Sequence, residues 1–201
     1  MNQDRRDLLR DAAIEVLADA GGRGLTHRAV DTASSVPLGT TKNYFPTRDA
    51  LLRAVAERCV EQYSEVTVQA MVAEAGPTDR EGLVAMLRSL LANVAGPGRP
   101  RMLAYMELQA EGARKSWLSA ILDQIATADF AGLELAQRDA GLPVTPQRAA
   151  VVTLALHGAI LHLLADSPRT LAAAGLRDLD HFVRSLLDAV YPEDPNGQHA
   201  V

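Results

Sequence analysis

The sequence predicts an all-helical protein. Ala, Leu, Glu and Arg dominate its 201 residues, and no segment shows the sustained period-two alternation of β-branched residues that a strand needs. Apolar residues instead recur at three- and four-residue steps within segments that Gly and Pro separate. We expect a domain of short helices at residues 1–47 and a bundle of longer helices at 48–191. Residues 192–201 are polar and predict a flexible tail.

Glycines separate the first two expected helices. Residues 4–20 carry Leu, Ala and Val on one face and mostly charged residues on the other. Gly21-Gly22 ends this helix, because glycine readily takes the left-handed conformation of a helix cap. Thr26 is a good N-cap for a shorter second helix that ends near Ser34.

Prolines limit the third helix. Pro37 suits a first helical turn, and Pro46 ends the helix after Phe45. Thr47 can cap a fourth helix with Asp49 in its first turn, where the helix dipole favours a carboxylate. We expect this helix to run to about residue 74 and to connect the two domains.

Further Gly and Pro residues interrupt the rest of the chain. Between these breaks the apolar spacing predicts helices at 78–94, 100–114, 116–140, 147–165 and 180–190, with a short helical turn near 170–174.

Composition indicates a cytoplasmic protein without a membrane partner. Hydrophobic residues make up 48% of the chain, enough for a buried core. No apolar run approaches the roughly 20 residues that cross a bilayer, and the N-terminus leads into an amphipathic pattern rather than a signal sequence. The single cysteine, Cys59, is expected to be a small buried hydrophobe, in keeping with a reducing compartment.

Charge is distributed unevenly along the chain. The net charge is −5, but residues 1–48 carry +1 and the remainder −6. Between residues 21 and 48 the only acid is Asp31, against Arg23, Arg28, Lys42 and Arg48. Phosphate binding needs local positive potential rather than positive total charge, so this segment suits a nucleic-acid surface.

The same segment has the pattern of a helix-turn-helix, in which the second helix enters the major groove of DNA. Polar side chains fill residues 40–44, little more than one helical turn, and are hard to explain as protein core. Val36 and Phe45 are expected to face inward.

The third helix offers several DNA-binding groups. Gly39 lets the backbone approach the sugar–phosphate chain, and the hydroxyls of Thr40 and Tyr44 can donate to phosphates. Lys42 and Asn43 can reach phosphates or base edges, with Asn suited to adenine.

Three further residues are expected to contact DNA. Thr26 lies at a helix N-terminus, where free backbone N–H groups bind phosphate. Arg28 is placed to reach a base or a phosphate, and Arg48 to anchor a phosphate. A solvated face is the more ordinary reading of the first-helix arginines, Arg5, Arg6 and Arg10.

Over about residues 5–55 the sequence resembles the TetR/AcrR family of bacterial transcriptional regulators. The likeness rests on the first-helix pattern from Leu9 to Gly21, on Leu25-Thr26, Val36 and Gly39-Thr40, and above all on Tyr44-Phe45-Pro46-Thr47-Arg48 followed by Leu51-Leu52. The resemblance implies an N-terminal DNA-binding domain followed by a ligand-binding and dimerisation domain.

Three positions depart from the family pattern. Ser35 stands where the turn usually has Gly at positive φ, which would cost about 1 kcal/mol if that conformation is kept. Thr41 stands in place of a large apolar residue, so we expect only its methyl group to be buried. Lys42 stands where an aromatic residue is common.

The resemblance also implies a small-molecule effector among the fourth to eighth helices. A pocket there would be mostly apolar with a few polar groups. Side chains of that character, each of which taken alone is more often plain core, are Tyr63, Met86, Leu90, Met102, Tyr105, Met106, Gln109, Trp117, Ile121 and His157. The deformable methionines suit an apolar or aromatic effector.

A homodimer is expected, because one short recognition helix buries too little surface and two-fold symmetry doubles it. Helices 147–165 and 180–190 are the expected interface, with contacts from Leu156, Ile160, Leu163, Phe182, Leu186 and Leu187.

The implied function is repression at a pseudo-palindromic operator in double-stranded DNA. An effector would tilt the fourth helix and move the two recognition helices apart. The alternative is a ligand-binding or protein-interaction module that has lost specific DNA binding, and Ser35 and Thr41 motivate it.

Enzymatic or metal chemistry has little support in the sequence, and no cofactor is expected. The acids that could act in such chemistry are best explained as solvated surface charges: Glu107, Glu111 and Asp123. His157 and His162 are five residues apart, whereas metal-binding pairs on a helix usually lie three or four apart.

Overall fold

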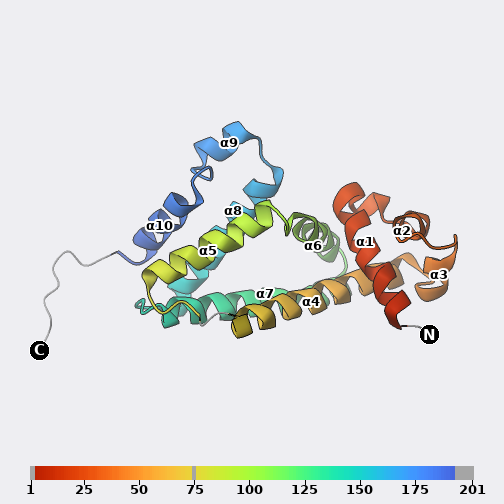
Figure 1. Ribbon diagram of the computed structural model, residues 1–201, viewed down its shortest axis with the longest axis horizontal. Helices are drawn as coiled ribbons and strands as arrows, with labels where there is room; N and C mark the ends of the chain where they lie inside the picture. Colours follow the sequence, from red (N-terminus) through yellow and green to blue (C-terminus); the bar gives the residue numbers. More distant parts are fainter. Residues whose placement is uncertain (1–2, 74–75, 193–201) are drawn as a thin grey trace, which may run out of the picture. The chain divides into compact units, whose positions relative to one another are not determined.

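The computed structural model describes residues 3–73 and 76–192, without the side chains of 66–73 (Figure 1). These ranges contain helices and no strand, which confirms the all-helical prediction. The helices are α1 (Gln3–Gly24), α2 (His27–Ala33), α3 (Thr40–Tyr44), α4 (Arg48–Ala73), α5 (Arg80–Ala95), α6 (Arg99–Gly112), α7 (Ser116–Asp139), α8 (Pro146–Ala165), α9 (Pro168–Ala173) and α10 (Leu179–Val190).

Capping residues begin the early helices as predicted. The Thr26 hydroxyl accepts the Ala29 amide at 3.1 Å at the start of α2. The Thr47 hydroxyl accepts the Ala50 amide at 3.0 Å at the start of α4. Gly21, at φ 65°, breaks the helical geometry near the end of α1. These positions carry the caps because Thr supplies an oxygen for a free amide and Gly tolerates positive φ.

One predicted helix start is wrong. Pro37 does not begin the third helix, because residues 37–39 form a turn and α3 begins at Thr40. The residue before that helix, Gly39, has φ 91°, which only glycine adopts without strain.

The chain divides into two compact units. The first comprises the described parts of residues 1–74 and 97–127, and therefore α1 to α4, α6 and the first half of α7. The second comprises the described parts of 75–96 and 128–201, with α5, α8 to α10 and the rest of α7. Within the first unit α1 packs on both α4 and α6.

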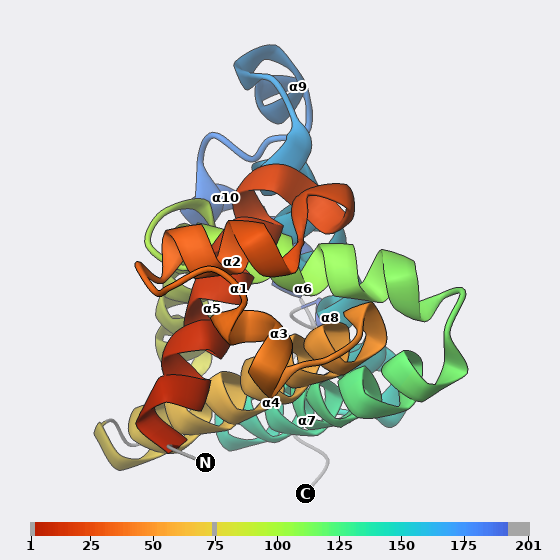
Figure 2. The ribbon, with the colours of Figure 1, turned by 90° about the vertical axis from the view of Figure 1, so that its right-hand side faces the viewer.

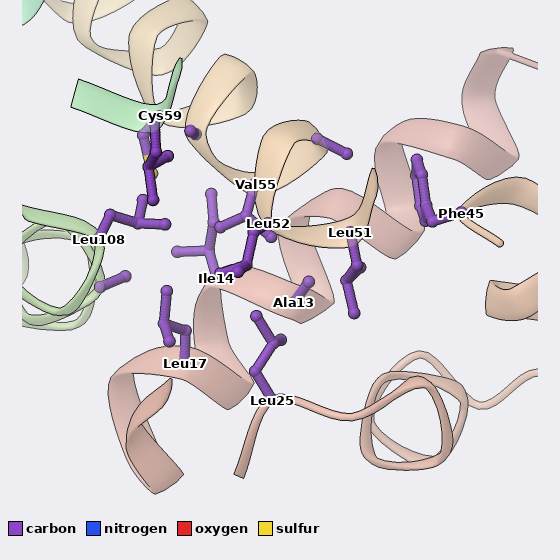
Figure 3. Close-up of a cluster of buried hydrophobic side chains, with 14 of the residues drawn as sticks. Ala13, Ile14, Leu17, Leu25, Phe45, Leu51, Leu52, Val55, Cys59 and Leu108 are labelled. Atoms are coloured by element: carbon purple, nitrogen blue, oxygen red, sulfur yellow. The ribbon is translucent and has the colours of Figure 1, made fainter. Parts of the chain in front are cut away.

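The core of the first unit joins the N-terminal helices to α4 and α6 (Figure 3). The apolar face of α1 is buried as predicted, and Phe45 also points into the core at 2% exposure. Cys59 is buried among these side chains, and burial raises the pKa of its thiol to about 12. It is therefore a small core residue rather than a reactive thiol.

Arg10 lies in the same unit and is not on a solvated face. Only 4% of its surface is exposed. Its guanidinium donates to the Ala54 carbonyl at 3.1 Å, to Asp7 at 2.9 Å and to Glu61 at 2.6 Å. The expectation of a solvated face is wrong for this residue because α1 turns it toward α4. There a backbone carbonyl and a carboxylate accept its hydrogen bonds.

In the second unit α5, α8 and α10 pack against one another. By length and composition alone α8 could cross a membrane, because it has 20 residues and a mean hydropathy of 1.6 over a window of 18 of them. The expectation that no apolar run approaches this length is therefore wrong. Ion pairs hold α10 to α5, and the guanidinium of Arg184 donates to both Glu81 oxygens at 2.5 and 2.7 Å. The buried Tyr191 hydroxyl donates to Gln137 of α7 at 2.9 Å.

Candidate nucleic-acid interface

The turn between α2 and α3 keeps a conformation that usually requires glycine. Ser35 has φ 54°, and it is the only described non-glycine residue at positive φ. The Val36 amide closes the turn by donating to the Asp31 carbonyl at 3.0 Å. The expectation of positive φ at Ser35 is confirmed, so the chain accepts the strain rather than changing the turn.

A buried carboxylate joins α2 to α3. Asp31 is 1% exposed, and one of its oxygens accepts both the Thr41 amide at 2.7 Å and the Thr41 hydroxyl at 2.6 Å. The other oxygen accepts the Gly39 amide at 2.7 Å. Burial acts to raise the pKa of Asp31, but these hydrogen bonds together outweigh it and hold the pKa below its ordinary value. The expectation that Thr41 buries only its methyl group is therefore wrong.

The helices α2 and α3 pack against each other in the first unit (Figure 2). Both carry exposed polar residues. Arg28, Lys42 and Asn43 are exposed, as predicted for DNA-contacting residues, and so is the capping residue Thr26. Nothing lies within 4 Å of a Cβ placed on Gly39, so its backbone is open to a close approach. Because Asp31 is the only acid between residues 21 and 48, burying it removes the one carboxylate from this surface.

Two of the predicted phosphate contacts are already engaged within the chain. The Thr40 hydroxyl donates to the Pro37 carbonyl at 2.6 Å, so its proton is not available to a phosphate. The Arg48 guanidinium donates to the carbonyls of Leu25 at 2.8 Å and Gly22 at 2.5 Å. Both side chains therefore make structural contacts within the first unit.

Tyr44 has a mixed position. It is half-buried and packs against the core, with its ring centroid 6.3 Å from that of Phe45. Part of the ring therefore covers the core under α3, and the contact of its hydroxyl with a phosphate stays a prediction. Val36 also packs against this core, as predicted.

Asp31 and Leu38 of the helix-turn-helix were not among the residues predicted from the sequence to form this surface. Asp31 was noted only as a lone acid, although it follows the apolar Val30 at the buried end of α2. Leu38 is 71% exposed in the turn that leads into α3. A leucine among polar groups at the start of a recognition helix is the signal that could have identified it.

The predicted effector residues fall in both units. In the first unit Tyr63, Tyr105 and Trp117 are half-buried and pack against the core, and Ile121 lies with them. Met102 and Met106 on α6 are half-buried, whereas Gln109 is exposed. Met86, Leu90 and His157 belong to the second unit and are half-buried.

Two of these side chains have charged neighbours. The Arg53 guanidinium lies 4.7 Å from the centre of the Trp117 ring, and the Lys115 ammonium lies 5.9 Å from it. His157 lies edge-on to Phe130, with Nε2 3.5 Å from a carboxylate oxygen of Asp129.

A separate open groove in the first unit is lined by α1, α2, α4 and the start of α6. Charged side chains line much of it, including Asp11, Arg58 and Arg101, and none of the predicted effector residues does.

Half of the predicted dimer contacts face the protomer's own interior. Leu156 and Leu187 are 1% and 0% exposed and Ile160 is 8% exposed, so these side chains are not free to meet a second protomer. Half-buried positions are taken by Leu163, Phe182 and Leu186. On α8 the exposed apolar side chains are Val151, Leu154 and Leu161.

Of the acids and histidines considered for chemistry, Asp123 is exposed and the others have structural partners. Glu107 is half-buried and accepts the Gly22 amide at 2.9 Å, so the expectation of a solvated charge is wrong for it. Glu111 pairs with Arg114 at 3.3 Å, and His162 pairs with Asp166 one helical turn away at 2.6 Å. These contacts secure helices and helix ends, so they give no reason to assign a reaction.

A helix-turn-helix with an acid-free outer face, followed by a helical bundle, defines the class of helix-turn-helix transcriptional regulators. The family model described as Tetracyclin repressor-like, C-terminal domain matches residues 78–189, more than half of the chain. The chain therefore belongs to the TetR family of transcriptional regulators.

Individual relatives agree with this assignment. An uncharacterized HTH-type transcriptional regulator in the dhlA 5' region of Xanthobacter autotrophicus is 32% identical over 89 residues, a match that spans 44% of this chain and 44% of the relative. The multidrug binding protein EbrR complexed with ethidium is 28% identical, with a TM-score of 0.66 over 94% of this chain and 99% of EbrR. A TetR-family member from Streptomyces coelicolor A3, SCO1917, shares the fold at 24% identity and a TM-score of 0.65, over 94% of this chain and 99% of its own.

Proposed function

We propose that this protein is a cytoplasmic homodimeric repressor that binds a pseudo-palindromic operator and leaves it when a small apolar or aromatic effector binds. The observation that carries the proposal is the outer face of α2 and α3. It exposes Arg28, Lys42 and Asn43, while the only acid of the segment, Asp31, is buried. Such a surface presents cations and base-reading groups to a polyanion.

The contacts to DNA divide into two groups in this proposal. Lys42 and Asn43 on α3 enter the major groove and reach base edges or phosphates. Arg28 on α2, with the exposed end of that helix at Thr26, contacts the backbone and sets the register. Thr40, Tyr44 and Arg48 act through the shape of the domain, because their side chains bind within it.

The proposed dimer forms through α8. Val151, Leu154 and Leu161 are 51%, 59% and 47% exposed, and their spacing of three and seven residues places them on one stripe of the helix. Gly158 continues the stripe, and nothing lies within 4 Å of a Cβ placed on it. An apolar stripe around a glycine suits close packing of two helices, so we assign this stripe to the partner protomer's α8.

Some of the proposed effector contacts lie on α4, the helix that follows the helix-turn-helix. Tyr63 belongs to α4, whose first residue, Arg48, is bonded to the carbonyls of Gly22 and Leu25. A ligand that packs against Tyr63, Tyr105 and Trp117 would therefore bear on the helix that holds α1 and α2. An aromatic effector is supported by EbrR, whose structures contain ethidium and proflavin.

The competing reading, a module without specific DNA binding, rested on Ser35 and Thr41. Ser35 takes the left-handed conformation that the turn requires, and Thr41 is held by Asp31. Neither substitution distorts the helix-turn-helix, so the structure gives no support to a loss of DNA binding.

A gel shift with the DNA that flanks the protein's own gene tests the proposal. We expect binding at low salt, with a strong decrease as salt rises. Failure of the purified protein to retain either this DNA or any duplex from a random library would refute the repressor. A separate experiment tests effector binding. Proflavin is titrated into the protein while the fluorescence of Trp117, the only tryptophan, is monitored.

A further inference from the structure

Leu38 is an apolar side chain displayed on a polar surface. It is 71% exposed, more than any other large hydrophobic side chain that the structure describes. Single exposed leucines are common on protein surfaces. Leu38, however, lies two residues before α3, on the segment that presents Lys42 and Asn43.

The backbone on both sides of Leu38 is held in place. After it, the Gly39 amide donates to Asp31 at 2.7 Å. Around it, the Pro37 carbonyl accepts the Thr40 amide at 3.1 Å and the Thr40 hydroxyl at 2.6 Å. A turn fixed by three hydrogen bonds presents its side chain at little further entropic cost on binding.

The surroundings of Leu38 indicate what it meets. No exposed acid lies between residues 21 and 47, and α2 and α3 expose the cations Arg28 and Lys42. An apolar group on a cationic surface matches the major groove, where thymine presents a C5 methyl group beside polar base edges and phosphates. The first residues of a recognition segment are those that reach base edges.

We propose that Leu38 is a specificity-determining residue that packs against the C5 methyl of one thymine in each half of the operator. The inference rests on the DNA-binding function proposed above. It assigns to Leu38 the apolar contact with a base methyl group, whereas the polar ends of Lys42 and Asn43 are suited to hydrogen bonds with base edges.

The test uses the duplex that the wild-type protein selects from a random library. Each thymine is replaced in turn by uracil, which differs from thymine only by lacking this methyl group. Affinities are measured for the wild type, for Leu38→Ala and for the control Leu135→Ala, which truncates an exposed leucine on α7. Thermal unfolding of the three proteins checks that each is folded.

At one thymine per half-site we expect uracil to weaken wild-type and Leu135→Ala binding by about fourfold, the equivalent of one buried methyl group. Leu38→Ala should bind thymine and uracil equally at that position. Wild-type binding that is insensitive to uracil everywhere, or sensitivity that persists in Leu38→Ala, would overturn the inference while leaving DNA binding intact. Absence of any selected duplex would instead refute the proposed function, and this inference with it.

Discussion

The Asp31 carboxylate holds Thr41 twice, through the Thr41 amide at 2.7 Å and the Thr41 hydroxyl at 2.6 Å. A helix as short as α3, with 5 residues, is not stable by itself, since helix nucleation is unfavourable. The polar contact therefore holds α3 in place, as the packing of a large apolar side chain at this position would do. It fixes the start of α3 to α2 and, through the Gly39 amide, the turn between them.

We expect Asp31→Asn and Thr41→Val to be coupled. Asp31→Asn should lower the free energy of unfolding by about 2 kcal/mol, because hydrogen bonds to a charged group are lost, and Thr41→Val by about 1 kcal/mol. In a double-mutant cycle by urea unfolding the pair should show an interaction energy of at least about 0.5 kcal/mol. Thr153→Val removes a buried hydroxyl on α8 and is the matched control. Coupling as large with Thr153 as with Thr41 would contradict the contact.

The stabilisation by Asp31 should depend on pH. Its hydrogen bonds lower the folded-state pKa below the ordinary aspartate value of 3.8. The contribution is therefore fully present above that value and is lost as the pH falls through the folded-state pKa. The stability difference between wild type and Asp31→Asn, measured by urea unfolding, should be constant from pH 7 to 5 and should shrink below about pH 4. A stability difference that grows on acidification would show that folding raises the pKa of Asp31 instead of lowering it.

Helix limits could be predicted from this sequence because Gly, Pro and capping residues act locally. Thr26 and Thr47 cap the helices they were expected to cap. The start of α3 could not be predicted in this way. Pro37 is compatible with a turn as well as with a helix, and the Gly39 conformation that decides between them depends on a carboxylate eight residues earlier.

The polar, exposed character of residues on α2 and α3 was also predictable, but the use of each side chain was not. A hydroxyl or guanidinium has the same sequence signature whether it meets DNA or its own chain. The acceptors of Arg48 lie 23 and 26 residues earlier, at Leu25 and Gly22. Only the tertiary fold brings them together, so local pattern assigns such donors to solvent or phosphate.

Replacing Ser35 by glycine should stabilise the protein. Ser35 has φ 54°, a conformation that costs a non-glycine residue about 1 kcal/mol. Ser35→Gly should raise the free energy of unfolding by up to that amount and leave the operator affinity unchanged. Ser34→Gly is the control, since Ser34 has φ −85° and its buried hydroxyl donates to the Val30 carbonyl at 2.6 Å. The control should therefore be destabilised, and equal stabilisation of both variants would argue against relief of strain at residue 35.

Lys42→Ala and Arg48→Ala should affect different properties. Lys42 is exposed on α3, so its loss should leave thermal stability unchanged and reduce the salt dependence of operator binding by about one phosphate contact per half-site. Arg48 donates to two backbone carbonyls, so its loss should lower the thermal midpoint. Gel shifts over a range of salt concentrations, with calorimetry on the free proteins, separate the two effects. If the salt dependence of operator binding is unchanged in Lys42→Ala, Lys42 does not contact a phosphate.

A charge on the exposed stripe of α8 should dissociate the dimer. Leu154, at 59% exposure, is the most exposed of the stripe residues Val151, Leu154 and Leu161. In a two-fold interface, Leu154→Glu would place a carboxylate against either the same carboxylate of the partner or the partner's apolar stripe. Burying an unpaired charge there costs more free energy than the apolar contacts supply. Light scattering should then report a folded monomer, and operator binding should weaken because two half-sites are no longer bound together. Leu135→Glu changes a leucine of 47% exposure on α7 and should leave the dimer intact. A Leu154→Glu protein that stays dimeric would move the interface away from this stripe.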